Sequence, residues 1–173
     1  DVIGDNNNYR TSATSYLEEL DDNLKQKIHE RIALCLGVNV RYGEGLQGQR
    51  YMPGQYYRDH VDPFENYAEE NDDTAMDVHG NRTWTVMVYL NNVDEGGHTN
   101  FPHLGRSFAP VPGTALAWLN LTGDRRINPF SEHAGMDVTR GRKYILNSWW
   151  REHLVDPTDP ENPESDADSD DED

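Results

Sequence analysis

A series of short strand-forming segments follows Gly45, and it constrains the fold of this chain more than any other feature. The clearest segment covers residues 82–91, which are rich in β-branched and aromatic side chains. Turn signals separate the segments: Gly96-Gly97 marks a turn or a bulge, and Pro112-Gly113 marks another turn. The expected strands are 46–52, 55–62, 82–91, 114–119 and 142–149.

One helix is expected before these strands, over residues 21–36. Its apolar residues recur every four positions and would form one stripe, at Leu20, Leu24, Ile28 and Ile32. Gly37 suits the left-handed end of a helix, and Ser15 with Glu18 would form a capping box if the helix began earlier. A leading helix with many short strands predicts a mainly β fold, a double-stranded β-helix (jelly-roll) barrel with a flanking helix.

The length of 173 residues suits one domain, which we place at 1–155. Residues 156–173 form a strongly acidic segment that is expected to be a disordered, solvated tail rather than a binding site for a basic partner. The formal net charge of −17 argues against binding to nucleic acid or to anionic membranes. The chain begins without methionine, so its N-terminus is expected to be truncated.

Cys35 is the only cysteine, which excludes an internal disulfide. No signal peptide or membrane span is recognisable in this segment, so the compartment stays open. Asn81 and Asn120 each begin a glycosylation sequon, a match that often arises by chance. Residues 63–79 contain no lysine or arginine, and this acidic segment is expected to be either a functional lid or disordered.

His60 and Asp62 flank Val61, and residues two apart in a strand point to the same side. A third ligand must then come from a neighbouring strand, for which His133 is the candidate. Two imidazoles and one carboxylate are the ligands that hold non-heme Fe(II) and leave other positions open. Lys143 follows ten residues later and would bind the carboxylate of a co-substrate. This set points to an oxygenase that uses iron, dioxygen and 2-oxoglutarate, whereas a second metal site at His98 and His103 is the weaker alternative.

Further motifs occur in a recognisable order between residues 9 and 151. They are Arg10-Thr11-Ser12, Gln49-Arg50-Tyr51, Pro53-Gly54-Gln55-Tyr56-Tyr57, Tyr89-Leu90-Asn91, the run from Glu95 to Pro102, Pro112-Gly113-Thr114-Ala115, His133-Ala134-Gly135 and Gly141-Arg142-Lys143. In these motifs the chain resembles the prolyl 4-hydroxylase family of 2-oxoglutarate dioxygenases, of the collagen-type and plant or algal kind. Lysine at position 143 favours this branch over lysyl hydroxylases and oxygen-sensing prolyl hydroxylases, which usually carry arginine there.

The resemblance implies a role for each matching residue. His60, Asp62 and His133 would bind Fe(II), and Lys143 would pair with the distal carboxylate of 2-oxoglutarate. Tyr51 and Thr99 match positions that assist co-substrate binding. The positions near the peptide groove are Tyr57, Arg82 and Trp149.

The implied activity is hydroxylation of peptidyl proline at C4, with release of succinate and CO2. The implied cofactors and co-substrates are Fe(II), 2-oxoglutarate, O2 and ascorbate. The expected partner is a proline-containing peptide or protein, with no nucleic acid and no membrane contact from this segment, and the resemblance is compatible with the endoplasmic reticulum. The alternatives are an inactive jelly-roll peptide-binding module, a jelly-roll protein that binds zinc or stores sugar, and a dioxygenase acting on another substrate.

Overall fold

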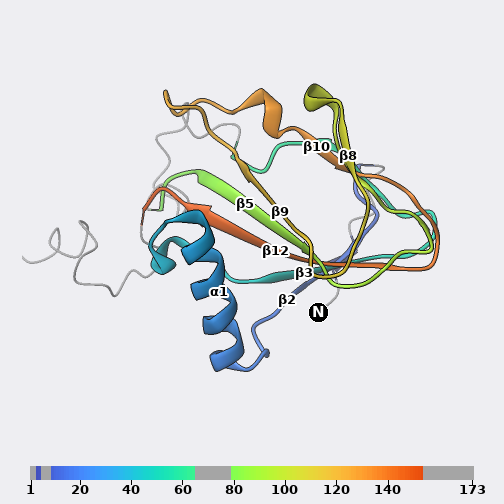
Figure 1. Cartoon of the computed structure of the whole chain (residues 1–173), viewed down its shortest axis with the longest axis horizontal. Coiled ribbons are helices and arrows are strands. Elements are labelled where there is room, and N and C mark those ends of the chain that lie inside the picture. Colours follow the sequence, from blue (N-terminus) through green and yellow to red (C-terminus); the bar gives the residue numbers. More distant parts are fainter. Residues whose placement is uncertain (1–2, 5–8, 65–78, 154–173) are drawn as a thin grey trace, which may run out of the picture.

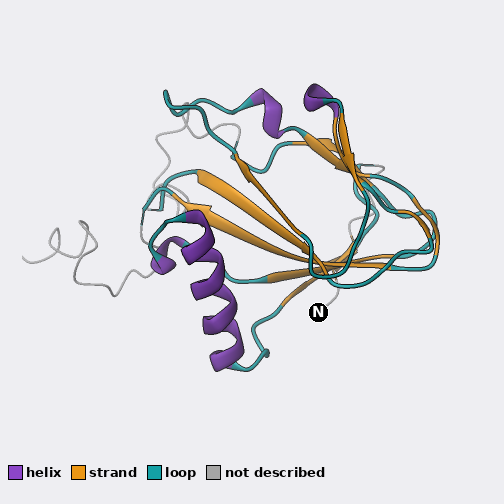
Figure 2. Ribbon diagram, viewed as in Figure 1, coloured by secondary structure: helices purple, strands orange, loops and turns teal. Residues whose placement is uncertain are grey.

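The computed structural model describes residues 3–4, 9–64 and 79–153, so the acidic segment and the tail predicted from the sequence lie largely outside the described residues. Two facing antiparallel sheets form the body of the molecule (Figures 1 and 2), which confirms the predicted jelly-roll fold. The larger sheet has the strand order β1-β2-β3-β12-β5-β9 and the smaller sheet has the order β4-β10-β7-β8. A third, two-stranded sheet pairs β11 with β6.

The five predicted strands are all present, with slightly different ends. They are β3 (Gln47–Tyr51), β4 (Tyr57–His60), β5 (Arg82–Tyr89), β9 (Ala115–Leu119) and β12 (Lys143–Arg151). One difference concerns the site, because β4 ends at His60 and Asp62 lies in the bend that follows. The prediction that one strand holds both residues is therefore wrong, although both side chains still face the interior.

Seven short strands were not expected from the sequence. They are β1 (Ile3–Gly4), β2 (Ala13–Tyr16), β6 (Glu95–Gly96), β7 (Thr99–Phe101), β8 (Arg106–Phe108), β10 (His133–Gly135) and β11 (Val138–Arg140). Gly96 belongs to β6, with a φ of 79°, and the register of the β6–β11 pair shifts there, so the predicted irregularity lies within a strand pair rather than in a free turn. A Cβ atom there would lie 2.2 Å from the carbonyl oxygen of Asp137, so this pairing with β11 requires glycine.

Helix α1 (Asp22–Leu36) matches the predicted range. Asp21 caps its N-terminus by accepting a hydrogen bond from Leu24 N, and Gly37 ends it with a φ of 70°. The alternative capping box is wrong, since Ser15 lies in β2. Leu24 is 45% exposed, so the predicted apolar stripe is only partly buried. The described residues also form three short 3-10 helices: η1 (Val40–Tyr42), η2 (Pro102–Leu104) and η3 (Pro129–Ser131).

Strand β12 contributes side chains to both faces of the larger sheet, because alternate side chains point to opposite faces. On the outer face, Trp150 packs edge-on against His29 of α1, with ring centroids 6.1 Å apart. On the inner face, Ile145 joins the core that fills the space between the sheets. The other buried members of that core are Tyr51, Met87, Tyr89 and Val138.

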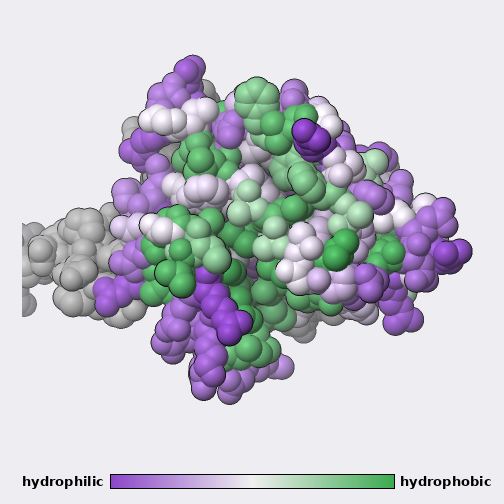
Figure 3. Space-filling view, in the orientation of Figure 1, coloured by the Kyte–Doolittle hydropathy of each residue, from purple (hydrophilic) through white to green (hydrophobic). Residues whose placement is uncertain are grey.

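Hydrophobic residues gather at the centre of the face shown in Figure 3, and hydrophilic residues surround them. Several large apolar side chains are exposed between residues 104 and 130, including Leu104, Phe108, Leu119 and Phe130. No helix among the described residues is long and apolar enough to cross a membrane.

Candidate functional site

A cavity of about 250 Å³ opens between the two sheets and contains every site residue predicted from the sequence. These residues are Tyr51, Tyr57, His60, Asp62, Arg82, Thr99, His133, Lys143 and Trp149. They come from both sheets and are separated by up to 98 residues, from Tyr51 to Trp149. The fold therefore concentrates the candidate residues in one place.

Strand pairing brings the two histidines together. His133 in β10 is the direct partner of His60 in β4, and the two ring centroids lie 4.2 Å apart. Asp62 faces both rings, with Oδ1 at 3.7 Å from His60 Nε2 and Oδ2 at 3.9 Å from His133 Nε2. These separations are too long for hydrogen bonds and leave room for an ion between the ligand atoms. The three potential ligand atoms lie within 4.8 Å of one another, and no other such cluster occurs among residues 3–4, 9–64 and 79–153.

The histidine rings are oriented for metal binding. Nδ1 of His60 lies 2.7 Å from the carbonyl oxygen of Arg58, and Nδ1 of His133 lies 2.9 Å from that of Ser131. A carbonyl oxygen only accepts, so each Nδ1 carries the proton and each Nε2 keeps its lone pair toward Asp62. Tyr57 stacks on the His60 ring at 3.6 Å and fixes its plane.

Electrostatics favour a neutral His60 beside an ionised Asp62. Burial, followed by the nearby charge of His133, lowers the pKa of His60 to about 4. Burial opposes ionisation of Asp62, but the charges of His133 and His60 and a hydrogen bond from Thr85 together hold the pKa of this carboxyl below its usual value. The side chains of His60, Asp62 and His133 are 9%, 8% and 9% exposed. Two imidazole nitrogens and one carboxylate suit a divalent first-row metal.

Lys143 provides a cation deeper in the same cavity. Its side chain is almost completely buried, and the strand register places it directly beside Tyr51. Nζ lies 4.2 Å from the centre of the Tyr51 ring, and no carboxylate in the described part of the chain pairs with it. Burial lowers the pKa of Lys143 to about 8. A buried ammonium group without an anion is poorly stabilised, so this position suits an anionic ligand.

Gly135 keeps the space beside Lys143 open. A Cβ atom at this position would lie 3.5 Å from Lys143 Nζ and 3.4 Å from the Tyr51 hydroxyl oxygen. That hydroxyl donates to Gln49 Oε1 at 2.8 Å, so it forms part of a fixed wall. Thr99 is also buried, and its hydroxyl accepts a hydrogen bond from the Tyr89 hydroxyl at 2.7 Å.

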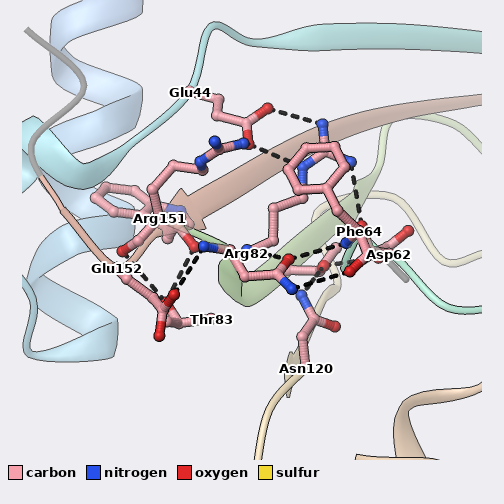
Figure 4. A network of polar contacts seen from close by, with 11 residues as sticks. Glu44, Asp62, Phe64, Arg82, Thr83, Asn120, Arg151 and Glu152 are labelled. Atoms are coloured by element: carbon pink, nitrogen blue, oxygen red, sulfur yellow. Dashed lines mark hydrogen bonds and ion pairs between the residues drawn. The ribbon is translucent and has the colours of Figure 1, made fainter. Parts of the chain in front are cut away.

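Arg82 lies at the cavity in a network of fixed contacts (Figure 4). Its Nε and Nη2 donate to the two carboxylate oxygens of Glu44, each at 2.8 Å, and its Nη1 donates to the carbonyl oxygen of Asp62 at 3.3 Å. The guanidinium also lies over Trp149, 4.1 Å from the ring centre. Arg82 therefore holds Glu44, Trp149 and the segment after β4 together, and only its remaining N–H groups are available to a ligand.

Sequence reasoning missed several residues that line the cavity. The main ones are Arg10, Tyr16, Gln47, Gln49, Thr85, Met87, Trp118 and Asn147. The alternation of Gln47, Gln49 and Tyr51 along one strand was a usable signal, since it puts polar groups on one inward face. Glu44 had no such signal, because it lies outside every strand and meets Arg82 only in the folded protein.

The remaining candidates from the sequence have ordinary structural roles. His103 pairs with Glu132 at 2.8 Å, and the alternative metal site with His98 does not appear among the described residues. Both sequon asparagines are buried. Asn81 accepts hydrogen bonds from Phe64 N and Arg82 N through its side-chain oxygen, so it is a structural residue.

Comparisons with known proteins agree with this geometry. Residues 46–151 match the family model of the 2OG-Fe(II) oxygenase superfamily. The chain is 37% identical over 152 residues to a putative prolyl 4-hydroxylase of Acanthamoeba polyphaga mimivirus, covering 87% of this chain and 62% of that protein. It is 34% identical over 144 residues to prolyl 4-hydroxylase subunit alpha-2 of Gallus gallus, covering 83% of this chain and 26% of that subunit. The chain thus spans less than two thirds of the length of these curated relatives.

A solved structure supports the same relationship. The viral collagen prolyl hydroxylase vCPH of Paramecium Bursaria Chlorella virus-1, in its 2OG complex, superposes with a TM-score of 0.68 at 30% sequence identity. The match covers 83% of this chain and 80% of that one. The chain therefore belongs to the prolyl 4-hydroxylase family within the 2OG-Fe(II) oxygenase superfamily.

Proposed function

We propose that this protein hydroxylates peptidyl proline at C4 in a reaction that consumes O2 and converts 2-oxoglutarate to succinate and CO2. One oxygen atom enters the new C–OH group and the other enters succinate, so the reaction balances. The observation that carries the proposal is that a His-Asp-His cluster and a buried lysine, with no anionic partner among the described residues, line the same cavity. A divalent metal and a dicarboxylate would satisfy both groups at once.

The donor set fits Fe(II), which the family implies as the metal. His60 Nε2, His133 Nε2 and one carboxylate oxygen of Asp62 would hold it. When bound, the iron supplies the activation of dioxygen and the oxidation of the substrate C–H bond. The protein contributes orientation, since the Nδ1 hydrogen bonds of both histidines fix the tautomer that metal binding needs.

Lys143 would bind the distal carboxylate of 2-oxoglutarate. Its ammonium group has no competing anion among the described residues, and the wall formed by Tyr51 and Gly135 leaves space beside it. A charge-assisted bond in this dry environment would position the co-substrate and exclude water from it. Tyr51 and Thr99 would shape this pocket, because their hydroxyl groups are already held by Gln49 and Tyr89.

Tyr57 and Trp149 would provide aromatic surfaces for the peptide near the metal. Proline-rich peptides populate the polyproline II conformation, which binds to aromatic-lined grooves at a low cost in ordering. Tyr57 is stacked on His60, and Trp149 is covered by Arg82. Arg82 would act mainly by holding Trp149 in place and would use its remaining N–H groups for peptide carbonyls. Ascorbate would serve only as a reductant that keeps the iron in the Fe(II) state.

Mass spectrometry of a panel of proline-rich peptides after incubation with Fe(II), 2-oxoglutarate, ascorbate and O2 tests the proposal. We expect a gain of one oxygen on proline, matched by succinate, and no gain with Asp62→Ala. A hydroxyl group on lysine, asparagine or a free small molecule with proline untouched would overturn the substrate assignment. Peptide binding without any succinate would instead identify an inactive peptide-binding module.

A further inference from the structure

Two buried residues outside the family motifs form a chain of hydrogen bonds that ends on Asp62. The Thr85 hydroxyl lies 2.6 Å from Asp62 Oδ2, and Asn120 Nδ2 lies 2.8 Å from the Thr85 hydroxyl. Thr85 is in β5 and Asn120 directly follows β9. Asn120 is completely buried and Thr85 is nearly so, so both hydrogen bonds are shielded from solvent.

The donors in this series of hydrogen bonds can be arranged in only one direction. An ionised carboxylate only accepts, so the proton shared between Thr85 and Asp62 must come from the Thr85 hydroxyl. The Thr85 oxygen then has lone pairs but no proton for its other partner. Asn120 must therefore present its amide nitrogen to Thr85, and the opposite orientation of the amide would take the proton away from Asp62.

Backbone hydrogen bonds fix the position from which the Asn120 side chain reaches Thr85. The backbone N–H of Asn120 donates to the carbonyl oxygen of Thr83 at 2.8 Å, and its own carbonyl oxygen accepts from Asn128 N at 2.8 Å. Asp62, in contrast, lies in the bend after β4, where no strand pairing fixes the direction of its side chain. Its carboxylate must be held by contacts from other elements.

We infer that Thr85, supported by Asn120, is the positioning residue that presents Asp62 to the metal. The hydrogen bond from Thr85 occupies Oδ2, whereas Oδ1 carries no hydrogen bond from the described residues and is left to bind the metal as a single ligand atom. Arg82 also donates a hydrogen bond to Asp62, at its backbone carbonyl oxygen. The inference rests on the proposed metal site and adds the residues that orient one of its ligands.

Metal affinity measured without co-substrate or peptide tests this role. Thr85→Val keeps the shape of the side chain but removes the hydroxyl, and we expect it to weaken Mn(II) binding by about 10–100-fold in anaerobic calorimetry. Thr85→Ser restores the hydroxyl and should bind Mn(II) within a few-fold of the wild type. Thr85→Ala serves as a second variant without a hydroxyl if Thr85→Val does not fold.

Thr83→Val is the matched control. Thr83 lies on the same strand and its hydroxyl donates to the carbonyl oxygen of Trp150 at 3.0 Å, so the variant also loses one hydrogen bond but none that reaches Asp62. It should leave Mn(II) affinity unchanged. The visible absorption spectrum of the Co(II)-loaded protein should change with Thr85→Val and not with Thr83→Val.

A double-mutant cycle tests the part played by Asn120. Because Asn120 reaches Asp62 only through Thr85, Asn120→Ala should weaken Mn(II) binding less than Thr85→Val, and the double variant should be no weaker than Thr85→Val alone. Wild-type affinity in Thr85→Val, or an equal loss in Thr83→Val, would refute the inference. If the wild-type protein bound no divalent metal, the proposed function itself would fail and this inference with it.

Discussion

Replacing Lys143 with methionine should change stability and co-substrate binding in opposite directions. No anion of the described residues pairs with this buried lysine, and burial lowers its pKa from 10.5 to about 8. That difference corresponds to a cost of about 3 kcal/mol for keeping the ammonium group charged at neutral pH. Loss of the contact with the Tyr51 ring offsets about 1 kcal/mol of the gain. Lys143→Met should therefore raise the free energy of unfolding of the ligand-free protein by about 2 kcal/mol.

The same change should weaken 2-oxoglutarate binding. Removing one partner of a desolvated ion pair costs about 3–5 kcal/mol, which is roughly a hundredfold or more in affinity. Urea denaturation at pH 7 measures the first effect, and anaerobic calorimetry with Mn(II) and 2-oxoglutarate measures the second. Lys27→Met, on the exposed face of α1, is the matched control and should change neither quantity. Lower stability together with unchanged 2-oxoglutarate affinity would refute the reasoning.

The pH dependence gives an independent check on Lys143. Its pKa is lower in the folded protein than in the unfolded chain, so between about pH 8 and pH 10.5 the unfolded state binds the extra proton. The contribution of this group to stability therefore rises with pH through that window, and Lys143→Met removes the rise. The affinity for 2-oxoglutarate should fall above about pH 8 as the ammonium group loses its proton. Lys143→Arg should bind 2-oxoglutarate more weakly than the wild type, because the guanidinium is larger and planar. The affinity of this variant should not show the same pH dependence.

Three further results are expected. Treatment with a chelator should abolish succinate formation, and Fe(II) should restore it. The variants His60→Ala, Asp62→Ala and His133→Ala should each be inactive with Fe(II). Full activity of any of these variants would exclude that residue as a ligand. Deletion of residues 157–173 should leave turnover of a short peptide nearly intact, because the family match ends at residue 151, and a large loss would show that the tail docks on the domain. Asn81→Ala should lower the free energy of unfolding by about 1–3 kcal/mol, since Phe64 N and Arg82 N lose their acceptor, and an unchanged urea midpoint would contradict this.

The sequence by itself determined the elements whose signals are local. The segment 82–91 has a long, regular pattern of strand-forming residues that predicts β5. Asp21 and Gly37 mark the ends of α1 through their capping chemistry. The order of the motifs also predicted the family, whereas the two-residue spacing of His60 and Asp62 predicted one strand for both, and Asp62 lies in a bend. The strand and the ends of the helix depend on residues that are neighbours in the chain.

Tertiary structure decided what depends on pairing between distant segments. Strands of two to four residues, such as β7 and β10, have too little periodicity to predict, and partner strands stabilise them. The register that puts His133 opposite His60 and Lys143 opposite Tyr51 arises from those pairings. The contact of Thr85 with Asp62 likewise joins a strand to a bend 23 residues away, and no sequence pattern specifies it. Side-chain direction within a strand is a local property, whereas the distance between two strands is set only when the sheets close around a common core.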